Sequence, residues 1–495
     1  MKKISNRMFI LAGVFALRAF FCADLYCGSL KIVFIEPDTT KTDTTHQWFR
    51  AINDTARINL CQKWLDNPSA QMALDLYERT WNIAHGEQTA SKAQPLYYIA
   101  LVRGGNNGDL GFQLTTASGV EDHAVTPFIK LDPSDWSFST TFLHETGHVM
   151  LSMLTGGKKI PKKEIAAIEH TTAALTDRGT AFDEGFAEHL ETLAAHVLSD
   201  PVITSRYLHE QFRFGVPDMQ GEYNRAIGDL LSFSQTRTRY YDVRENNFSF
   251  VPAYKGPDYY RVQMEKSRDF SLLRNPNQLL QAEGFYATFF FCLTVRGNST
   301  PAFSLVKERQ QKILEALKEM FETKTMTADS PYLLDFTETY MKKNPSEAAE
   351  ITDVLLDLSH GVFVDRNAAA LWKNHYLGAL KLDMAERNNE KIAKARDAWH
   401  ASVMNDPKIL YSLLGPQIRY EVPARSVLLV AFEQPSPLSF DLNTVDEGIM
   451  RMIPDITDSE VKSWLDRREQ KAFTGADDFK SRSGLHDAVL KSMKF

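Results

Sequence analysis

A short segment near the end of the first third of the chain has the residue spacing of a metal site. Phe138–Leu154 reads FSTTFLHETGHVMLSML and contains the pattern H-E-x-x-H at His144, Glu145 and His148. Residues four apart in an α-helix lie on the same face, so the two imidazoles would point to one position. Glu145 lies beside that position, where a general base acting on a metal-activated water is expected. The spacing therefore predicts a zinc site with two of its ligands.

Two histidines leave such a site incomplete, because catalytic zinc takes three protein ligands and keeps one position open. A metzincin continuation requires Gly and His where this chain has Leu151 and Leu154, which excludes that class. Farther along, residues 181–191 read AFDEGFAEHLE. In a helix, Glu184, Glu188 and Glu191 would lie on one face.

Residues 183–188 (DEGFAE) resemble the second motif of the gluzincins, zinc peptidases of the thermolysin and membrane-alanyl-aminopeptidase type. The aminopeptidase motif reads N-E-G-F-A, and Asp183 replaces the Asn here. The resemblance implies that Glu184 is the third zinc ligand and that Glu188 orients a ligand histidine. Asp183 could act at the site or cap the second helix. Gly147 and Gly185 would let the two helices approach closely.

The chain also departs from the gluzincin pattern. Thirty-five residues separate His148 from Glu184, more than in the aminopeptidases, and their substrate-amine motif is absent. The oxyanion-stabilising residue is not identified by sequence. Its tyrosine candidates are Tyr223, Tyr240, Tyr241, Tyr254, Tyr259 and Tyr260. The other histidines near the motifs, His170, His189 and His196, are expected at the surface or supporting the site rather than on the metal.

By this resemblance the mechanism is peptide hydrolysis. Zinc lowers the pKa of its water toward ~7 and polarises the scissile carbonyl, and Glu145 passes the water proton to the leaving amine. We expect the substrate backbone to pair with an edge strand at residues 126–131.

Several elements must position these motifs. Strands are predicted at residues 30–35, 96–102, 110–115 and 126–131, with a glycine-rich turn at residues 104–108 that makes a hairpin. Helices are predicted at residues 44–60, 70–81, 162–174 and 182–198. Residues 232–263 are expected to form loops near the cleft. This order of strands followed by the H-E-x-x-H helix is typical of a zincin catalytic domain.

Composition limits the class of protein. The chain has 495 residues, enough for two or three domains, and 43% hydrophobic and 24% charged residues are typical of folded proteins. A net charge of -7 argues against a general nucleic-acid binder. No interior segment has the ~18 apolar residues that span a bilayer.

The first 28 residues have the layout of a signal peptide, with Lys2, Lys3 and Arg7 before an apolar run. Cleavage is the favoured interpretation; lipidation at Cys22 or Cys27, or an uncleaved anchor, stays open. The chain is thus expected to be exported: periplasmic, secreted or envelope-anchored, with membrane contact only through this segment. Cys61 and Cys292 are too few for a disulfide framework.

The second half is predicted to be helical, with helices at residues 279–293, 305–322 and 367–403 and an extended segment at residues 418–432. Residues 439–479 then resemble a helix-hairpin-helix domain of competence DNA receptors and of a minor pseudopilin of type II secretion. Thr444 and Glu447 would form a capping box. The hairpin Asp455-Ile456-Thr457 lacks the glycines of the DNA-binding version, so we expect a structural or protein-contact module.

These observations predict an α+β fold: a zincin-like catalytic domain with a small mixed sheet and active-site helices, then a helical region and a helix-hairpin-helix module. The predicted domains are residues 1–28 (signal or anchor), 29–275 (metallopeptidase), 276–435 (helical) and 436–495 (module). The predicted function is that of an exported Zn²⁺-dependent peptidase acting on a peptide or protein substrate. The alternative is a catalytically inactive gluzincin-like scaffold in the cell envelope, with an envelope protein as the partner of the C-terminal module.

Overall fold

The computed structural model describes most of the chain in separate stretches. They are residues 30–86, 95–132, 138–162, 175–198, 248–252, 260–264, 274–296, 302–379, 382–416, 418–422, 438–445, 450–451 and 453–494. The chain divides into two compact units, Met1–Lys158 and Lys159–Phe495. The fold mixes helices and strands, as predicted. The predicted signal segment lies outside the described residues, and so does the predicted helix at residues 162–174 apart from Lys162.

The first unit is built on five strands that close into a barrel in the order β1-β2-β4-β5-β3. Their bounds are β1 Lys31–Pro37, β2 Trp48–Ala51, β3 Leu96–Leu101, β4 Asn106–Thr116 and β5 Gly119–Leu131. β3 pairs in parallel with β1 and with β5, whereas β4 runs antiparallel to β5. Mixed pairing was predicted, but closure of the sheet was not.

A continuous apolar run explains the burial of β3. Its sequence LYYIAL is buried from Tyr97 to Leu101, as expected for a parallel strand covered on both faces. The barrel core is formed by apolar side chains of all five strands: Ile35, Phe49, Tyr98, Ala100, Phe112, Leu114 and Phe128.

The described part of this unit also contains the helices α2 Thr55–Leu65, α3 Pro68–His85 and α5 Phe138–Leu154. Asn67 caps α3 by accepting the N–H of Ser69 at 2.8 Å, and Pro68 takes the first helical position. α3 packs against α5, and α5 packs against β4 and β5. The metal-motif helix is thus fixed by a second helix and by two strands.

Two predictions for this unit are wrong. Residues 44–60 are not one helix, because residues 48–51 pair with β1 and β4 as strand β2, and Asp54 accepts backbone N–H groups where α2 begins. The turn at residues 104–108 does not form a hairpin, because β3 pairs with β1 and β5 and not with β4. The hairpin is formed instead by β4 and β5 around Gly119.

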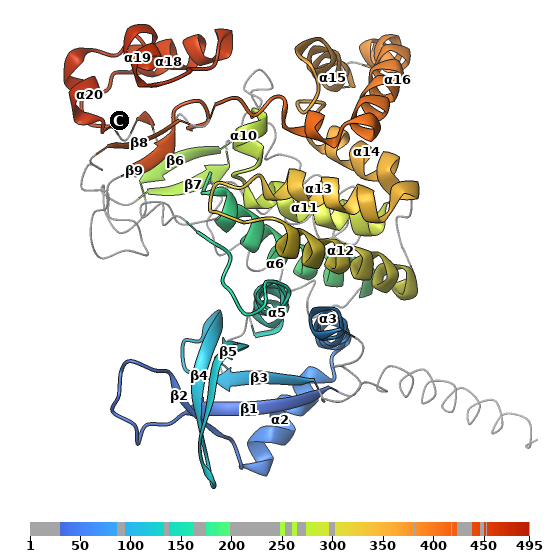
Figure 1. Cartoon of the computed structure of the whole chain (residues 1–495), viewed down its shortest axis with the longest axis vertical. Coiled ribbons are helices and arrows are strands. Elements are labelled where there is room, and N and C mark those ends of the chain that lie inside the picture. Colours follow the sequence, from blue (N-terminus) through green and yellow to red (C-terminus); the bar gives the residue numbers. More distant parts are fainter. Residues whose placement is uncertain are drawn as a thin grey trace, which may run out of the picture. The chain divides into compact units, whose positions relative to one another are not determined.

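The second unit has a helical body around α11 Glu283–Val295, which is buried along its whole length. Such all-round burial suits a sequence, EGFYATFFFCLTV, that is apolar on every face. Around it, Figure 1 shows α6, α12 and α13, and α14 also packs on it. Their bounds are α6 Arg178–Leu198, α12 Phe303–Thr323, α13 Tyr332–Lys343 and α14 Ala348–Leu358.

The remaining elements of this body are shorter or more peripheral. They are β6 Phe248–Pro252, β7 Tyr260–Met264, α10 Pro276–Leu279, η2 Pro345–Glu347, α15 Arg366–Ala379, α16 Leu382–Asn405 and η3 Pro407–Tyr411. The prediction of loops at residues 232–263 is wrong where the structure describes them, since β6 and β7 form an antiparallel pair. The predicted helix at residues 367–403 is two helices.

A small module ends the chain. It contains β8 Arg419–Val422, β9 Leu438–Asp441, α18 Asp458–Gln470, α19 Ala476–Arg482 and α20 Asp487–Ser492. β8 and β9 pair antiparallel, and both contribute to a core centred on Trp464 and Phe479. The core therefore takes in β8, which precedes the predicted start at residue 436.

The hairpin before α18 keeps a conformation that usually favours glycine. Asp455 has a φ of 63°, in the left-handed region that Asp adopts more readily than most residues. Thr457 and Glu460 then form a capping box at the start of α18. The capping box predicted at Thr444 and Glu447 lies partly outside the described residues, because Glu447 is not among them.

Among the described residues, every helix is too short or too polar to cross a lipid bilayer.

Candidate metal centre

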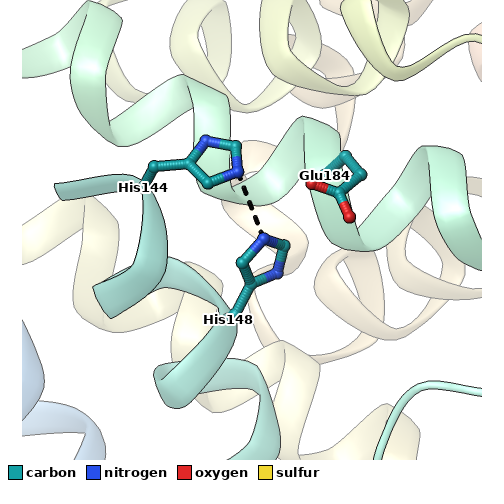
Figure 2. A group of neighbouring side chains, drawn as sticks. All are labelled: His144, His148 and Glu184. Atoms are coloured by element: carbon teal, nitrogen blue, oxygen red, sulfur yellow. Dashed lines mark hydrogen bonds between the residues drawn. The ribbon is translucent and has the colours of Figure 1, made fainter. Parts of the chain in front are cut away.

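The histidines of α5 face each other. The Nε2 atoms of His144 and His148 lie 3.2 Å apart, and their ring centroids are 4.9 Å apart. This confirms the predicted convergence of two imidazoles one helical turn apart (Figure 2). Both residues are partly exposed.

Glu145 is largely buried, and β4 holds its carboxylate. The backbone N–H of Gly108 donates a hydrogen bond to Glu145 Oε2 at 2.5 Å. A Cβ on Gly108 would lie 3.1 Å from the Cβ of His148 and 3.5 Å from Glu145 Oε2. Glycine at this position therefore lets β4 run close to the metal-motif helix.

The strand edge beside α5 is β4, and the predicted edge strand is wrong. Residues 126–131 belong to β5, which is flanked by β3 on one side and β4 on the other. Along residues 106–110, by contrast, β4 pairs with β5 alone among the described residues, and β2 pairs only farther along, at residues 113–115. The sequence at 126–131 looked like an edge because alternation of residue types does not reveal a strand's partners.

A buried hydroxyl pair fixes α5 from its other face. The hydroxyl of Tyr97 in β3 lies 2.7 Å from that of Thr146, which in turn donates to the carbonyl of Phe142 at 2.6 Å. Tyr77 of α3 stacks on Tyr97 with ring centroids 4.0 Å apart. Burial raises the pKa of Tyr97 well above its ordinary value, so its hydroxyl stays neutral. No spacing pattern in the sequence points to these residues.

The second motif lies within α6, whose cap is Asp177. The carboxylate of Asp177 accepts the backbone N–H of Thr180 at 3.0 Å and its hydroxyl at 2.7 Å. Since α6 begins at Arg178, Asp183 lies in its second turn. The suggestion that Asp183 caps this helix is wrong.

Asp183 and Glu184 share a lysine instead. The ammonium group of Lys162 lies 2.7 Å from Asp183 Oδ2 and 3.0 Å from Glu184 Oε1. Burial lowers the pKa of Lys162, but the two carboxylates act more strongly and raise it above its ordinary value. Lys162 is therefore a stable cation at the predicted third ligand. No sequence pattern points to this role of Lys162.

Gly185 approaches α11. A Cβ on Gly185 would lie 2.4 Å from the carbonyl oxygen of Glu283 and 2.5 Å from Tyr286 Cβ. The helix that approaches α6 closely at this glycine is thus α11, not the histidine-bearing helix as predicted. The nearby rings of Phe186 and Phe290 meet edge to face at 5.3 Å, which anchors the turn of α6 that contains Glu184 in the core.

His144, His148 and Glu184 form the group of possible metal ligands that the described residues contain. One potential ligand atom from each lies within 4.8 Å of the others, and Figure 2 shows the carboxylate of Glu184 with the two imidazoles. Two imidazole nitrogens and one carboxylate oxygen are a usual donor set for catalytic zinc. The side chains present therefore fit the predicted metal.

Of the remaining candidate site residues, the structure describes the side chains of some and not of others. Glu188 is a partly buried residue of α6, and its contact with a ligand histidine stays a prediction. His189 is a core residue, and burial lowers its pKa to about 4. Its ring forms hydrogen bonds with the backbone carbonyl of Phe186 and with the side-chain amide of Gln310. The side chains of His170, His196 and the six tyrosine candidates are not described.

Comparisons with known proteins leave the family open. No protein-family model, curated protein or solved structure matches this chain. The gluzincin and helix-hairpin-helix resemblances therefore rest on the motif residues alone.

Proposed function

We propose that this chain is a zinc-dependent peptidase of gluzincin type. The main support is the grouping of His144, His148 and Glu184, with the carboxylate of Glu145 next to the first of them in the chain. A histidine pair by itself is a weak signal. A carboxylate from a separate motif that joins the pair makes three ligands, the number that catalytic zinc sites use.

In this proposal His144, His148 and Glu184 hold the metal. A bound zinc ion supplies Lewis-acid activation of water and of the scissile carbonyl. Glu145 accepts the proton of the attacking water and delivers it to the leaving amine. Its buried carboxylate accepts the Gly108 N–H, and this bond helps to orient the carboxylate.

A peptide substrate is favoured by the incomplete strand pairing of β4. Along residues 106–110 its backbone pairs with β5 alone among the described residues. An extended peptide can add to such an edge through main-chain hydrogen bonds, while its side chains point alternately to either side. Asn107 is exposed there and could contact the substrate without disturbing the barrel core.

The alternative, an inactive scaffold, is favoured by one contact. Lys162 places an ammonium group 3.0 Å from Glu184 Oε1, and a cation already paired with this carboxylate could replace a metal. The C-terminal module would then serve as the protein-binding part in the cell envelope. Export remains part of either proposal.

The decisive experiment combines metal analysis with peptide cleavage. Purified protein is assayed for zinc and for cleavage of a peptide library, and Glu145→Gln is compared with Glu322→Gln, an exposed residue of α12. We expect Glu145→Gln to keep its zinc and to lose about 10²–10⁴-fold in turnover, the usual contribution of a general base. Glu322→Gln should behave as wild type.

Two outcomes would contradict the proposal. Full turnover in Glu145→Gln would show that Glu145 is not the general base. Zinc at one ion per chain without any cleavage would favour the scaffold.

A further inference from the structure

Lys162 reaches the second motif because the segment before it packs tightly on α6. A Cβ on Gly179 would lie 1.9 Å from the carbonyl oxygen of Pro161, so glycine is required in this first turn of α6. Ile160 is buried, at 6% exposure. The backbone therefore fixes the position of Lys162 near Gly179, which precedes Asp183 by about one helical turn.

The contacts of Lys162 form a branched charge cluster. Its ammonium group lies within hydrogen-bonding distance of Asp183 and Glu184, whose side chains are 11% and 9% exposed, while that of Lys162 is 37% exposed. Two neighbouring carboxylates repel each other when they are removed from water. One ammonium group between them offsets this repulsion and fixes both carboxylates at the same time.

We propose that Lys162, anchored by Asp183, is a positioning residue that orients the Glu184 carboxylate for metal binding; this inference rests on the proposed function. A carboxylate has about four lone-pair sites on its two oxygens. A hydrogen bond from Lys162 uses one of them, so it does not by itself exclude a metal. Ligating carboxylates are commonly held in this way by a neighbouring hydrogen-bond donor.

The opposite role is that Lys162 competes with the metal for Glu184. A single Lys162→Met variant would not separate the two roles, because it also leaves the charge of Asp183 unbalanced and so attracts cations. The double variant Lys162→Met with Asp183→Asn removes one positive and one negative charge together. Only the effect of orienting Glu184 then remains.

The test is the zinc dissociation constant, measured by competition with a chromophoric chelator. We expect the double variant to bind zinc about 10–100-fold more weakly than wild type, the usual cost of losing a ligand's supporting partner. Lys162→Arg keeps the positive charge and has N–H donors for both carboxylates, so its zinc dissociation constant should stay close to that of wild type. Lys158→Met, a matched change in a nearby exposed lysine, should have no effect.

Unchanged zinc binding in the double variant would overturn the inference. Tighter binding would also overturn it and would identify Lys162 as a competitor of the metal. Circular dichroism checks that each variant is folded. If the double variant does not fold, Gly179→Ala provides a second test, because it displaces Pro161 and Lys162 without changing any charge and should also weaken zinc binding. Wild-type protein that takes up no zinc would overturn the proposed function itself, a result distinct from failure of the variants alone.

Discussion

At the scale of single residues, Glu460 shows how hydrogen bonds keep a buried carboxylate charged. Its oxygens accept the backbone N–H and hydroxyl of Thr457, at 3.0 and 2.8 Å, and the backbone N–H of His486, at 2.7 Å. His486 Nδ1 is 2.6 Å away. Burial raises the pKa of Glu460, but these hydrogen bonds lower it more, to about 2.

This lowered pKa makes the C-terminal module sensitive to acid. Because the pKa is about 2 in the folded chain and about 4.3 in an unfolded one, Glu460 stabilises the fold fully above pH ~4.5. That stability is lost as pH falls toward 2. We expect Glu460→Gln to be less stable than wild type at pH 6 and to approach it at pH 3.

Hydrogen exchange of the α18 amides, corrected for the intrinsic rate at each pH, measures this difference. Glu469→Gln, in the same helix but without the Thr457 and His486 contacts, is the control. A gap between Glu460→Gln and wild type that has the same size at both pH values would contradict the prediction.

Residue spacing reveals some of the candidate site and not the rest. His144 and His148 were predictable because a helix fixes how residues four apart relate. Lys162, Tyr97 and Gly108 were not, since each acts through a partner 21 or more residues away in the sequence. Only the folded backbone brings such pairs together.

At the scale of elements, the crossing of α6 and α11 depends on Gly185. A Cβ there would lie 2.4 Å from one backbone oxygen and 3.0 Å from the backbone N of Ala287, and backbone atoms cannot move aside as a flexible side chain can. We expect Gly185→Ala to destabilise the fold by about 1–3 kcal/mol or more.

Thermal unfolding followed by circular dichroism measures this cost. Gly475→Ala is the matched control, because its Cβ would meet no atom within 4 Å and its φ of 173° suits any residue. A Gly185→Ala variant as stable as the control would show that α6 and α11 can separate at little cost.

The secondary structure of an element was predictable where the pattern of its own residues determines it. The apolar run of β3 and the amphipathic pattern of α12 were identified correctly. The helix proposed for residues 44–60 failed because residues 48–51 are held by pairing with β1 and β4, which overrides local propensity. The edge strand predicted at residues 126–131 was misassigned for the same reason, because a strand's own sequence does not determine which strands it pairs with.

At the scale of the whole molecule, the C-terminal module is joined to the helical body of its unit by polar contacts. Gln281 donates to the hydroxyl of Thr444 at 2.8 Å, and Asn275 to the carbonyl of Asn443 at 3.3 Å. Asn443 also bonds the backbone of Phe473 inside the module, at 2.7 and 2.9 Å. The module's resemblance to helix-hairpin-helix domains did not predict this attachment, which depends on residues before α11.

Metal binding should also stabilise the folded chain as a whole. An ion that binds the folded state and not the unfolded one adds about 4 kcal/mol when its free concentration is a thousand times its dissociation constant. For domains of 150–250 residues each kcal/mol raises the melting temperature by roughly 2–4 °C. We therefore expect zinc to raise the melting temperature, a chelator to reverse the rise, and Glu145→Gln to respond as wild type does.

The variant His148→Ala removes one proposed ligand and should lose most of this rise in melting temperature. An equal rise in His148→Ala would mean that zinc binds elsewhere on the chain, and the proposed site would then have to be abandoned whatever the activity of the protein.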